Sequence, residues 1–153
     1  MAVIVLTVAF VSGCSFSKND ELNQAALAGD QVRCEALLRR GAKVNGAGMH
    51  AMKPIMMAAQ GGHVDTVRYL VSQGADVNAH NDSGSALMWA VDAGTEELTL
   101  FLLTQGSNAS WSNALGRTAL DLAGEQGRTN LVSLIETWSK RTRPDTAPNA
   151  PRR

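Results

Sequence analysis

The sequence is poor in the residues and motifs on which enzymes and metal sites depend. It holds two cysteines and three histidines among 153 residues, and aromatic residues make up 5% of it. No HExxH, GxSxG, paired-cysteine or phosphate-loop pattern occurs, although each of these patterns is what places a catalytic or ligating group. We therefore expect no enzyme, no cofactor and no metal site in this chain.

The chain also lacks an excess of either charge, because 14 basic and 14 acidic residues give a formal net charge of zero. The two signs are nevertheless separated along the chain. Residues 19–139 hold eight basic and thirteen acidic residues, whereas residues 140–153 hold five basic residues and one acidic residue. Nucleic-acid binding depends on basic groups that neutralise phosphates, so the acidic body argues against a nucleic-acid partner.

No apolar run has the roughly 20 residues that a membrane-spanning helix needs. The longest run lies in residues 1–13 and has the length of a signal-peptide core, although no Lys or Arg precedes it. It ends in VSGC at 11–14, which resembles the lipobox of bacterial lipoproteins. This resemblance implies a lipidated Cys14 and, because Ser15 is not Asp, an outer-membrane protein facing the periplasm. The alternative is a cytosolic protein whose leader is not a signal.

Short segments recur along the chain with a period near 33 residues. The segment GAKVN at 41–45 returns as GADVN at 74–78 and as GSNAS at 106–110. A period of this length is typical of ankyrin repeats, in which each unit is a pair of helices with a turn.

A second set of segments has the same spacing. KPIMMAA at 53–59, SALMWA at 85–90 and TALDLA at 118–123 resemble the Thr-Pro-Leu-His-x-Ala signature of the ankyrin family. The resemblance covers residues 19–139. It implies an all-α ankyrin-repeat solenoid of about four helix-turn-helix repeats joined by hairpin-like loops.

The repeat register sets the expected organisation of the chain. The expected segments are a signal peptide at 1–13, a short linker at 14–18, repeats at about 19–45, 46–78, 79–110 and 111–139, and a disordered basic Pro-rich tail at 140–153.

Local chemistry agrees with this register. Ser85, Thr118 and, in the first repeat, Asp20 can each accept a hydrogen bond from an early backbone N–H and so cap a helix. Pro54 suits a first helical turn, where its missing N–H is harmless. The helices that follow these caps carry small residues, which allow neighbouring repeats to stack closely: Ala25, Ala26, Ala58, Ala59, Ala90 and Ala123. Three glycines are placed to end the second helices in left-handed turns: Gly41, Gly74 and Gly106. Polar residues on the first helix are expected to face outward and close the stack: Asn19, Asp20, Glu21, Asn23 and Gln24.

Three residues of types that often act in catalysis or binding have structural explanations here. His63 completes the family's Gly-His pair, where a histidine meets backbone groups. Cys34 occupies the position of a buried aliphatic residue, where a thiol fills core volume. Trp89 stands where the family has Leu, so we expect it to pack in the core.

In the ankyrin family, partners bind the hairpin loops and the exposed ends of the first helices. The positions that match are Met49, His50, Met52, Gln60, His80, Asp82, Asp92, Trp111, Ser112, Leu115, Arg117 and Glu125. Trp111 replaces the small residue that Ala79 represents, so it is either an exposed aromatic anchor for a partner or folded over the neighbouring repeat. Asp92 and Glu125 would form an acidic strip for a basic partner or remain solvated.

These observations predict a non-catalytic lipoprotein, itself a monomer, that binds another protein in the periplasm. An immunity protein that neutralises a secreted effector toxin is one such role, by analogy with small lipidated repeat proteins. A structural or oxidative-stress-protective envelope protein is a second, and a cytosolic adaptor is a third.

Overall fold

The computed structural model describes residues 17–142. The expected signal peptide, the lipidation of Cys14 and the tail beyond residue 142 therefore lie outside the described residues. Within the described range, the chain forms eight α-helices, one short 3-10 helix and one two-stranded hairpin. The expected all-α ankyrin-repeat solenoid is confirmed.

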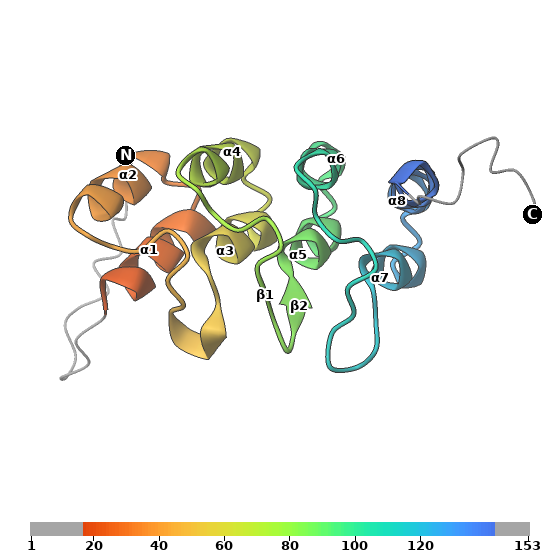
Figure 1. Ribbon diagram of the computed structural model, residues 1–153, viewed down its shortest axis with the longest axis horizontal. Coiled ribbons are helices and arrows are strands. Elements are labelled where there is room, and N and C mark those ends of the chain that lie inside the picture. Colours follow the sequence, from red (N-terminus) through yellow and green to blue (C-terminus); the bar gives the residue numbers. More distant parts are fainter. Residues whose placement is uncertain (1–16, 143–153) are drawn as a thin grey trace, which may run out of the picture.

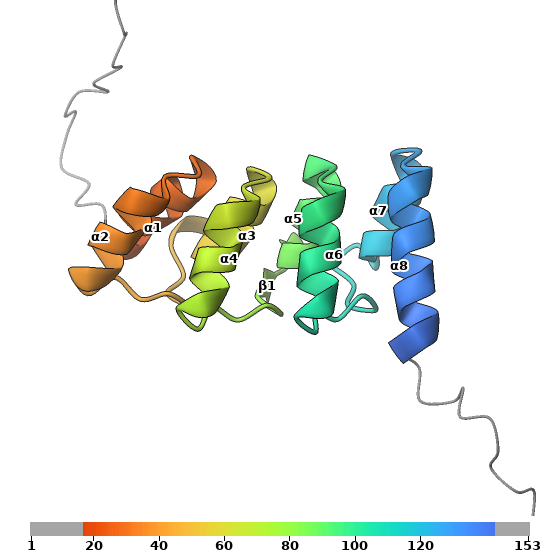
Figure 2. The ribbon, with the colours of Figure 1, turned by 90° about the horizontal axis from the view of Figure 1, so that it is seen from above.

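The helices form two rows, which Figure 1 shows one above the other and Figure 2 shows from above. The inner row consists of α1 (Lys18–Leu27), α3 (Pro54–Gln60), α5 (Ala86–Ala93) and α7 (Ala119–Glu125). The outer row consists of α2 (Gln31–Arg39), α4 (Val64–Ser72), α6 (Glu96–Thr104) and α8 (Thr129–Thr142). Each inner helix and the outer helix that follows it make one repeat.

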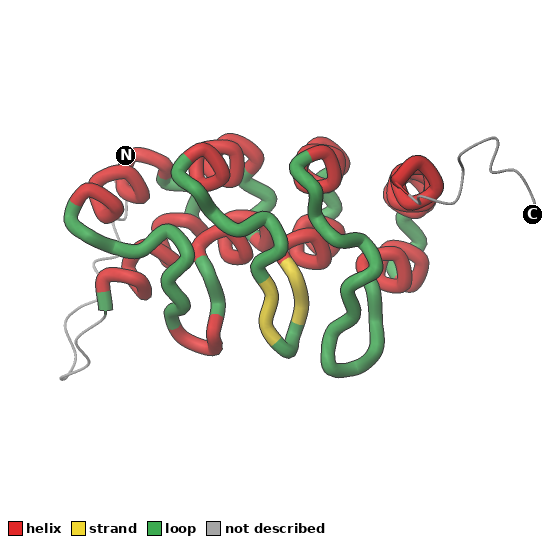
Figure 3. The backbone as a smooth tube through the Cα atoms, viewed as in Figure 1, coloured by secondary structure: helices red, strands yellow, loops and turns green. Residues whose placement is uncertain are grey.

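Three loops, which we call fingers, project below the inner row (Figure 3). The first finger, 46–53, contains the 3-10 helix η1 (Met49–Ala51). The second finger, 79–85, is an antiparallel hairpin of β1 (His80–Asn81) and β2 (Gly84–Ser85). The third finger, 111–118, is closed by an isolated bridge between Ser112 and Thr118. The loops expected from the register are thus present, each with a different backbone.

The core lies between the two rows and between neighbouring inner helices. α3 packs against both α1 and α5, and α5 packs against α7. The alanines on these helices are buried as expected: Ala25, Ala26, Ala58, Ala59, Ala90 and Ala123. Leu70 and Leu102 on the outer row are fully buried and close the core from above. Small side chains on the inner row therefore set the spacing of the repeats.

The residues that cap the helices are those expected from the sequence, except at the first helix. The hydroxyl of Ser85 accepts from the N–H of Met88, and that of Thr118 accepts from the N–H of Asp121, as expected. The first helix is capped by Ser17, whose Oγ accepts from the N–H of Asp20, and not by Asp20. The helix begins one residue earlier than the expected repeat boundary, and this places Asp20 in its first turn.

Asp20 and Asp121 complete two capping boxes. The carboxylate of each accepts from the N–H of the capping residue, Ser17 or Thr118, as well as from its hydroxyl. Hydrogen bonds to the ionised form favour it. The hydroxyl and backbone of Ser17 accordingly lower the pKa of Asp20, and the backbone and hydroxyl of Thr118 lower the pKa of Asp121. These caps therefore weaken in acid, as each carboxylate is protonated.

Two further expectations about the ends of the solenoid need correction. Asn23, expected on an outward polar face, is 5% exposed and donates from Nδ2 to the carbonyl of Met52 at 2.8 Å. The last helix, α8, continues to Thr142 and so passes the expected start of the tail at residue 140. None of the helices described for residues 17–142 is long and apolar enough to cross a membrane.

Two side chains link the end of an inner helix to the next repeat. His63 contacts the carbonyl of Leu27 through Nε2 at 2.9 Å, which agrees with the structural role expected for it. Arg128 takes the same position in the last repeat, and its guanidinium donates to the carbonyls of Val91 and Asp92 at 2.7 and 2.9 Å. These donors satisfy helix-terminal carbonyls that have no partner within their own helix.

The first finger carries a conformational strain that the third avoids. Ala51 has a φ of 55°, and Gly116, at the same position of its repeat, has a φ of 73°. Left-handed backbone costs a non-glycine residue about 1–2 kcal/mol. Replacing Ala51→Gly should therefore raise the free energy of unfolding by roughly 0.5–1 kcal/mol after the greater chain entropy of glycine is counted.

Urea unfolding followed by circular dichroism measures this change. The reverse replacement, Gly116→Ala, serves as the matched variant and should lower the free energy of unfolding by a similar amount. A loss of stability in Ala51→Gly would contradict the strain.

Candidate protein-binding face

Asparagine side chains join each finger to the one before it. Asn81 Nδ2 donates to the carbonyl of His50 at 3.0 Å, and Asn113 Nδ2 donates to the carbonyl of Ser83 at 3.2 Å. The Oδ1 atoms of the same two residues accept from backbone N–H groups of their own fingers. The three fingers therefore form one connected surface rather than three independent loops.

The first finger has glycine, Gly48, where the other two have asparagine, and it is held from α1 instead. Asp20 Oδ1 accepts from the N–H of Met49 at 2.9 Å, and Asn23 donates to the carbonyl of Met52. A Cβ at Gly48 would collide with the side chain of Asn23. Glycine at this position thus allows α1 to hold the first finger.

Two hollows lie where the fingers meet the inner helices. The first hollow has a volume of about 350 Å³ and is lined by Asp20, Asn23, Gln24, Met49, His50, Met52, Met57, Gln60, Asn81, Ser83 and Trp89. The second hollow has a volume of about 480 Å³ and is lined by Asp82, Ser83, Gly84, Met88, Trp89, Asp92, Asn113, Ala114, Leu115, Arg117 and Leu122. We call these two hollows and their rims the finger face.

Trp89 forms the wall between the two hollows and is the residue that the sequence argument undervalued. It is half-buried and packs against the core as expected, yet it also lines both hollows. Its Nε1 is buried without a hydrogen-bond partner among the described residues. The equivalent residues of the neighbouring repeats, Met57 and Leu122, line the first and second hollow respectively. The repeat register itself could therefore have identified this position as surface-forming.

The second hollow combines apolar walls with acidic groups. Leu115, at the tip of the third finger, is 76% exposed. Asp92 accepts from Gln126 Nε2 at 2.7 Å, and Glu125 forms an ion pair with Arg117. Of the two residues of the expected acidic strip, Glu125 is therefore paired with a cation, whereas Asp92 accepts from a neutral amide.

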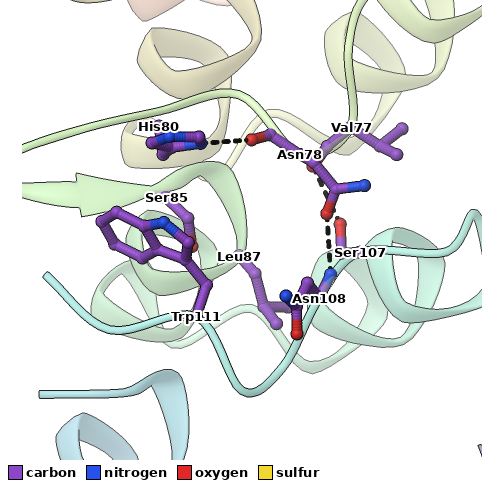
Figure 4. A pocket seen from close by; sticks show the side chains of 8 residues that line it. All are labelled: Val77, Asn78, His80, Ser85, Leu87, Ser107, Asn108 and Trp111. Atoms are coloured by element: carbon purple, nitrogen blue, oxygen red, sulfur yellow. Dashed lines mark hydrogen bonds between the residues drawn. The ribbon is translucent and has the colours of Figure 1, made fainter.

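Trp111 packs over the neighbouring repeat, which is one of the two arrangements that the sequence left open. Whether its partly exposed ring also contacts a partner stays a prediction. Its ring lies 4.9 Å from that of His80, centroid to centroid, with an interplanar angle of 40°. Figure 4 shows both rings among the residues that line this hollow, together with the hydrogen bond between Asn78 and Asn108. The hollow that they line measures about 210 Å³ and shares no lining residue with the two hollows of the finger face.

The other residues expected to face a partner differ in their exposure to solvent. Met49 is 62% exposed, and Gln60 and Ser112 are also exposed. Met52 was expected to face a partner but is only 9% exposed, because its side chain turns inward and its Sδ accepts from Asn81 Nδ2 at 3.2 Å. Eight of the expected positions line the two hollows: Met49, His50, Met52, Gln60, Asp82, Asp92, Leu115 and Arg117. Whether these residues contact a partner stays a prediction.

Cys34, whose thiol is a potential nucleophile, occupies a buried structural position. Cys34 is fully buried on α2, and burial, together with the nearby Asp30, raises the pKa of its thiol to about 11. A thiol with such a pKa holds little of the reactive thiolate at neutral pH. Cys34 therefore fills core volume.

Comparison with known proteins identifies the repeat. The family model of ankyrin repeats (3 copies) matches residues 22–112. The chain belongs to the ankyrin-repeat family. Ankyrin repeats mediate protein–protein interaction, and domains of this family are generally non-catalytic binding modules. The finger face lies on the loops and inner helices of this repeat domain.

Individual relatives share the repeats within much longer chains. The chain is 33% identical over 128 residues to a probable E3 ubiquitin-protein ligase, XBOS34, of Oryza sativa subsp. japonica, covering 81% of this chain and 25% of that protein. It is 37% identical over 128 residues to the E3 ubiquitin-protein ligase XBAT33 of Arabidopsis thaliana, covering 80% and 25%. It is 26% identical over 120 residues to a transient receptor potential channel subfamily A member 1 homolog of Caenorhabditis elegans, covering 78% and 10%. The chain thus spans a quarter or less of the length of these relatives.

The burial of Cys34 yields a direct chemical test. Native protein carrying Cys14→Ser should react with a thiol reagent such as dithionitrobenzoate at neutral pH far more slowly than the same protein in denaturant, because the thiol is both inaccessible and protonated. The absorbance of the released thiolate measures the rate. Equal rates in the two conditions would show that Cys34 is open to solvent.

Proposed function

We propose that this chain is a non-catalytic, lipid-anchored protein that faces the periplasm and binds one protein partner through the finger face. We further propose that the partner is a secreted effector toxin and that binding neutralises it, which makes the chain an immunity protein. The observation that carries the binding role is the second hollow, where exposed apolar side chains stand beside a charged aspartate.

The second hollow has the composition of a recognition surface. Leu115 and Trp89 supply apolar area, and large apolar side chains in the centre of an interface provide much of its binding energy. Leu115 stands at the tip of a finger that Asn113 fixes to its neighbour, so little loop ordering opposes binding. The carboxylates of Asp82 and Asp92 favour a basic segment on the partner.

The proposed anchor depends on Cys14. The apolar run before it and the lipobox-like VSGC support lipidation. Each acyl CH₂ that enters the bilayer contributes about 0.8 kcal/mol, so attachment of several chains holds a protein firmly. Only two residues separate Cys14 from Ser17, where the described structure begins. An anchor at Cys14 would therefore hold the first repeat near the membrane surface.

Replacing Cys14→Ser tests the anchor. In cells labelled with radioactive palmitate, the natural chain should carry the label and sediment with membranes, whereas Cys14→Ser should lose both properties. Cys34→Ala is the control and should keep label and location. A natural chain that is unlabelled and remains in the soluble fraction would contradict the lipoprotein role and favour a cytosolic adaptor.

A pair of exposed aliphatic residues tests the finger face. Leu115 is 76% exposed in the second hollow, and Val32 is 78% exposed on α2, outside the finger face. Leu115→Ser should weaken binding of the partner by roughly tenfold or more, the loss expected when an apolar anchor is truncated. Val32→Ser should leave binding unchanged, and both variants should keep the stability of the natural chain. Calorimetric titration with the partner, first identified by affinity capture and mass spectrometry, measures these affinities.

The immunity role is tested by the survival of cells that are exposed to the captured partner. Cells that lack the protein should die when the captured partner is expressed in their periplasm, and the natural chain should protect them while Leu115→Ser protects them less. Survival of unprotected cells would contradict the toxin as partner. Equal binding by the Leu115→Ser and natural chains would contradict the finger face, whatever the partner is.

A further inference from the structure

Soft metal-binding side chains gather in the first hollow. Met49, His50 and Met52 lie within four consecutive residues of the first finger, and Met57 lies in the first turn of α3, which follows. All four residues line the same hollow of about 350 Å³. The second and third fingers carry no methionine, so this composition is a property of the first finger alone.

Four of the side chains around the hollow carry soft electron-pair donors, namely three thioether sulfurs and one imidazole. The carboxylate of Asp20 also borders the hollow, and its two oxygens accept hydrogen bonds from Ser17 and from the N–H of Met49. The soft donors favour a cation over an anion. The described residues hold no cluster of three or more His, Cys, Asp or Glu side chains that could hold a metal ion, which is the donor set that zinc prefers.

We propose that the first hollow binds one monovalent soft metal ion, Cu(I), through the sulfur atoms of Met49 and Met52 and the imidazole of His50, with Met57 as a further thioether ligand. Thioether ligands select Cu(I), and imidazole also suits copper. In the structure the Sδ of Met52 accepts a hydrogen bond from Asn81 Nδ2, so binding of the ion by this sulfur would replace that hydrogen bond. The site shares only Ser83 and Trp89 with the lining of the second hollow.

Binding can be measured by competition with a coloured Cu(I) chelator under anaerobic conditions. The full chain carrying Cys14→Ser is used, so that the terminal thiol takes no metal. We expect it to withdraw one equivalent of Cu(I) from the chelator. The double variant Met49→Leu/Met52→Leu should bind at least 10- to 100-fold more weakly, since even the loss of an outer-shell partner costs a metal site about that much.

Two controls separate this site from other sources of binding. Met56 is fully buried in the core and is absent from the hollow, so Met56→Leu should bind Cu(I) like the parent chain. Cys34→Ala should also bind like the parent. Failure to withdraw Cu(I), unchanged affinity in the double variant, or loss of binding in Cys34→Ala would each overturn the proposal.

The methionine methyl groups report the site directly. Cu(I) and Ag(I) are both diamagnetic, so ¹³C–¹H spectra of methyl-labelled methionine can be followed during titration with Ag(I). We expect the signals of Met49, Met52 and Met57 to shift until one equivalent is added, while those of Met56 and Met88 stay in place. Unmoved signals for the first three, or equal shifts for all five, would overturn the proposal even if a variant failed to fold.

Discussion

Close stacking of the inner helices is the constraint on which the rest of the molecule depends. Ala58, Ala59, Ala90 and Ala123 are fully buried at these contacts, so neighbouring inner helices approach more closely than bulkier residues would allow. The fingers leave from the ends of these helices and inherit their spacing. That spacing is what lets Asn81 reach the preceding finger, and it turns three short loops into one surface. A larger side chain on the inner row would therefore disturb recognition as well as stability.

The repeat organisation could be predicted from the sequence because it is periodic, and the shapes of the fingers could not because they break the period. The second finger is one residue shorter than the other two, counted from Asn78 to Ser85 against Ser110 to Thr118. Met52 turns inward because an amide from the next finger meets its sulfur. No local pattern in the first finger contains that information. Trp89 stands at a register position whose residues line a hollow in three successive repeats, but the leucine that the family has at this position favoured a core interpretation.

The finger face carries two kinds of chemistry side by side. The first hollow is rich in thioethers, whereas the second presents a projecting leucine beside carboxylates. Trp89 lines both hollows. A protein that covers the second hollow and an ion that occupies the first would thus both lie beside the same indole, whose Nε1 has no hydrogen-bond partner in the described chain.

Different side-chain contacts join successive repeats of the solenoid. His63 clamps the first repeat to the second, and Arg128 clamps the third to the fourth. Among the hydrogen bonds described for residues 17–142, no side chain does this for the end of α3. At that central junction, Arg68 on α4 instead pairs with Glu97 and lies over the ring of Phe101, both on α6. Exposed ion pairs weaken as salt screens them. The contact between α4 and α6 at this junction is therefore one that added salt weakens, whereas the hydrogen bond of His63 to the carbonyl of Leu27 and the packing of α3 against α5 do not depend on ion pairs.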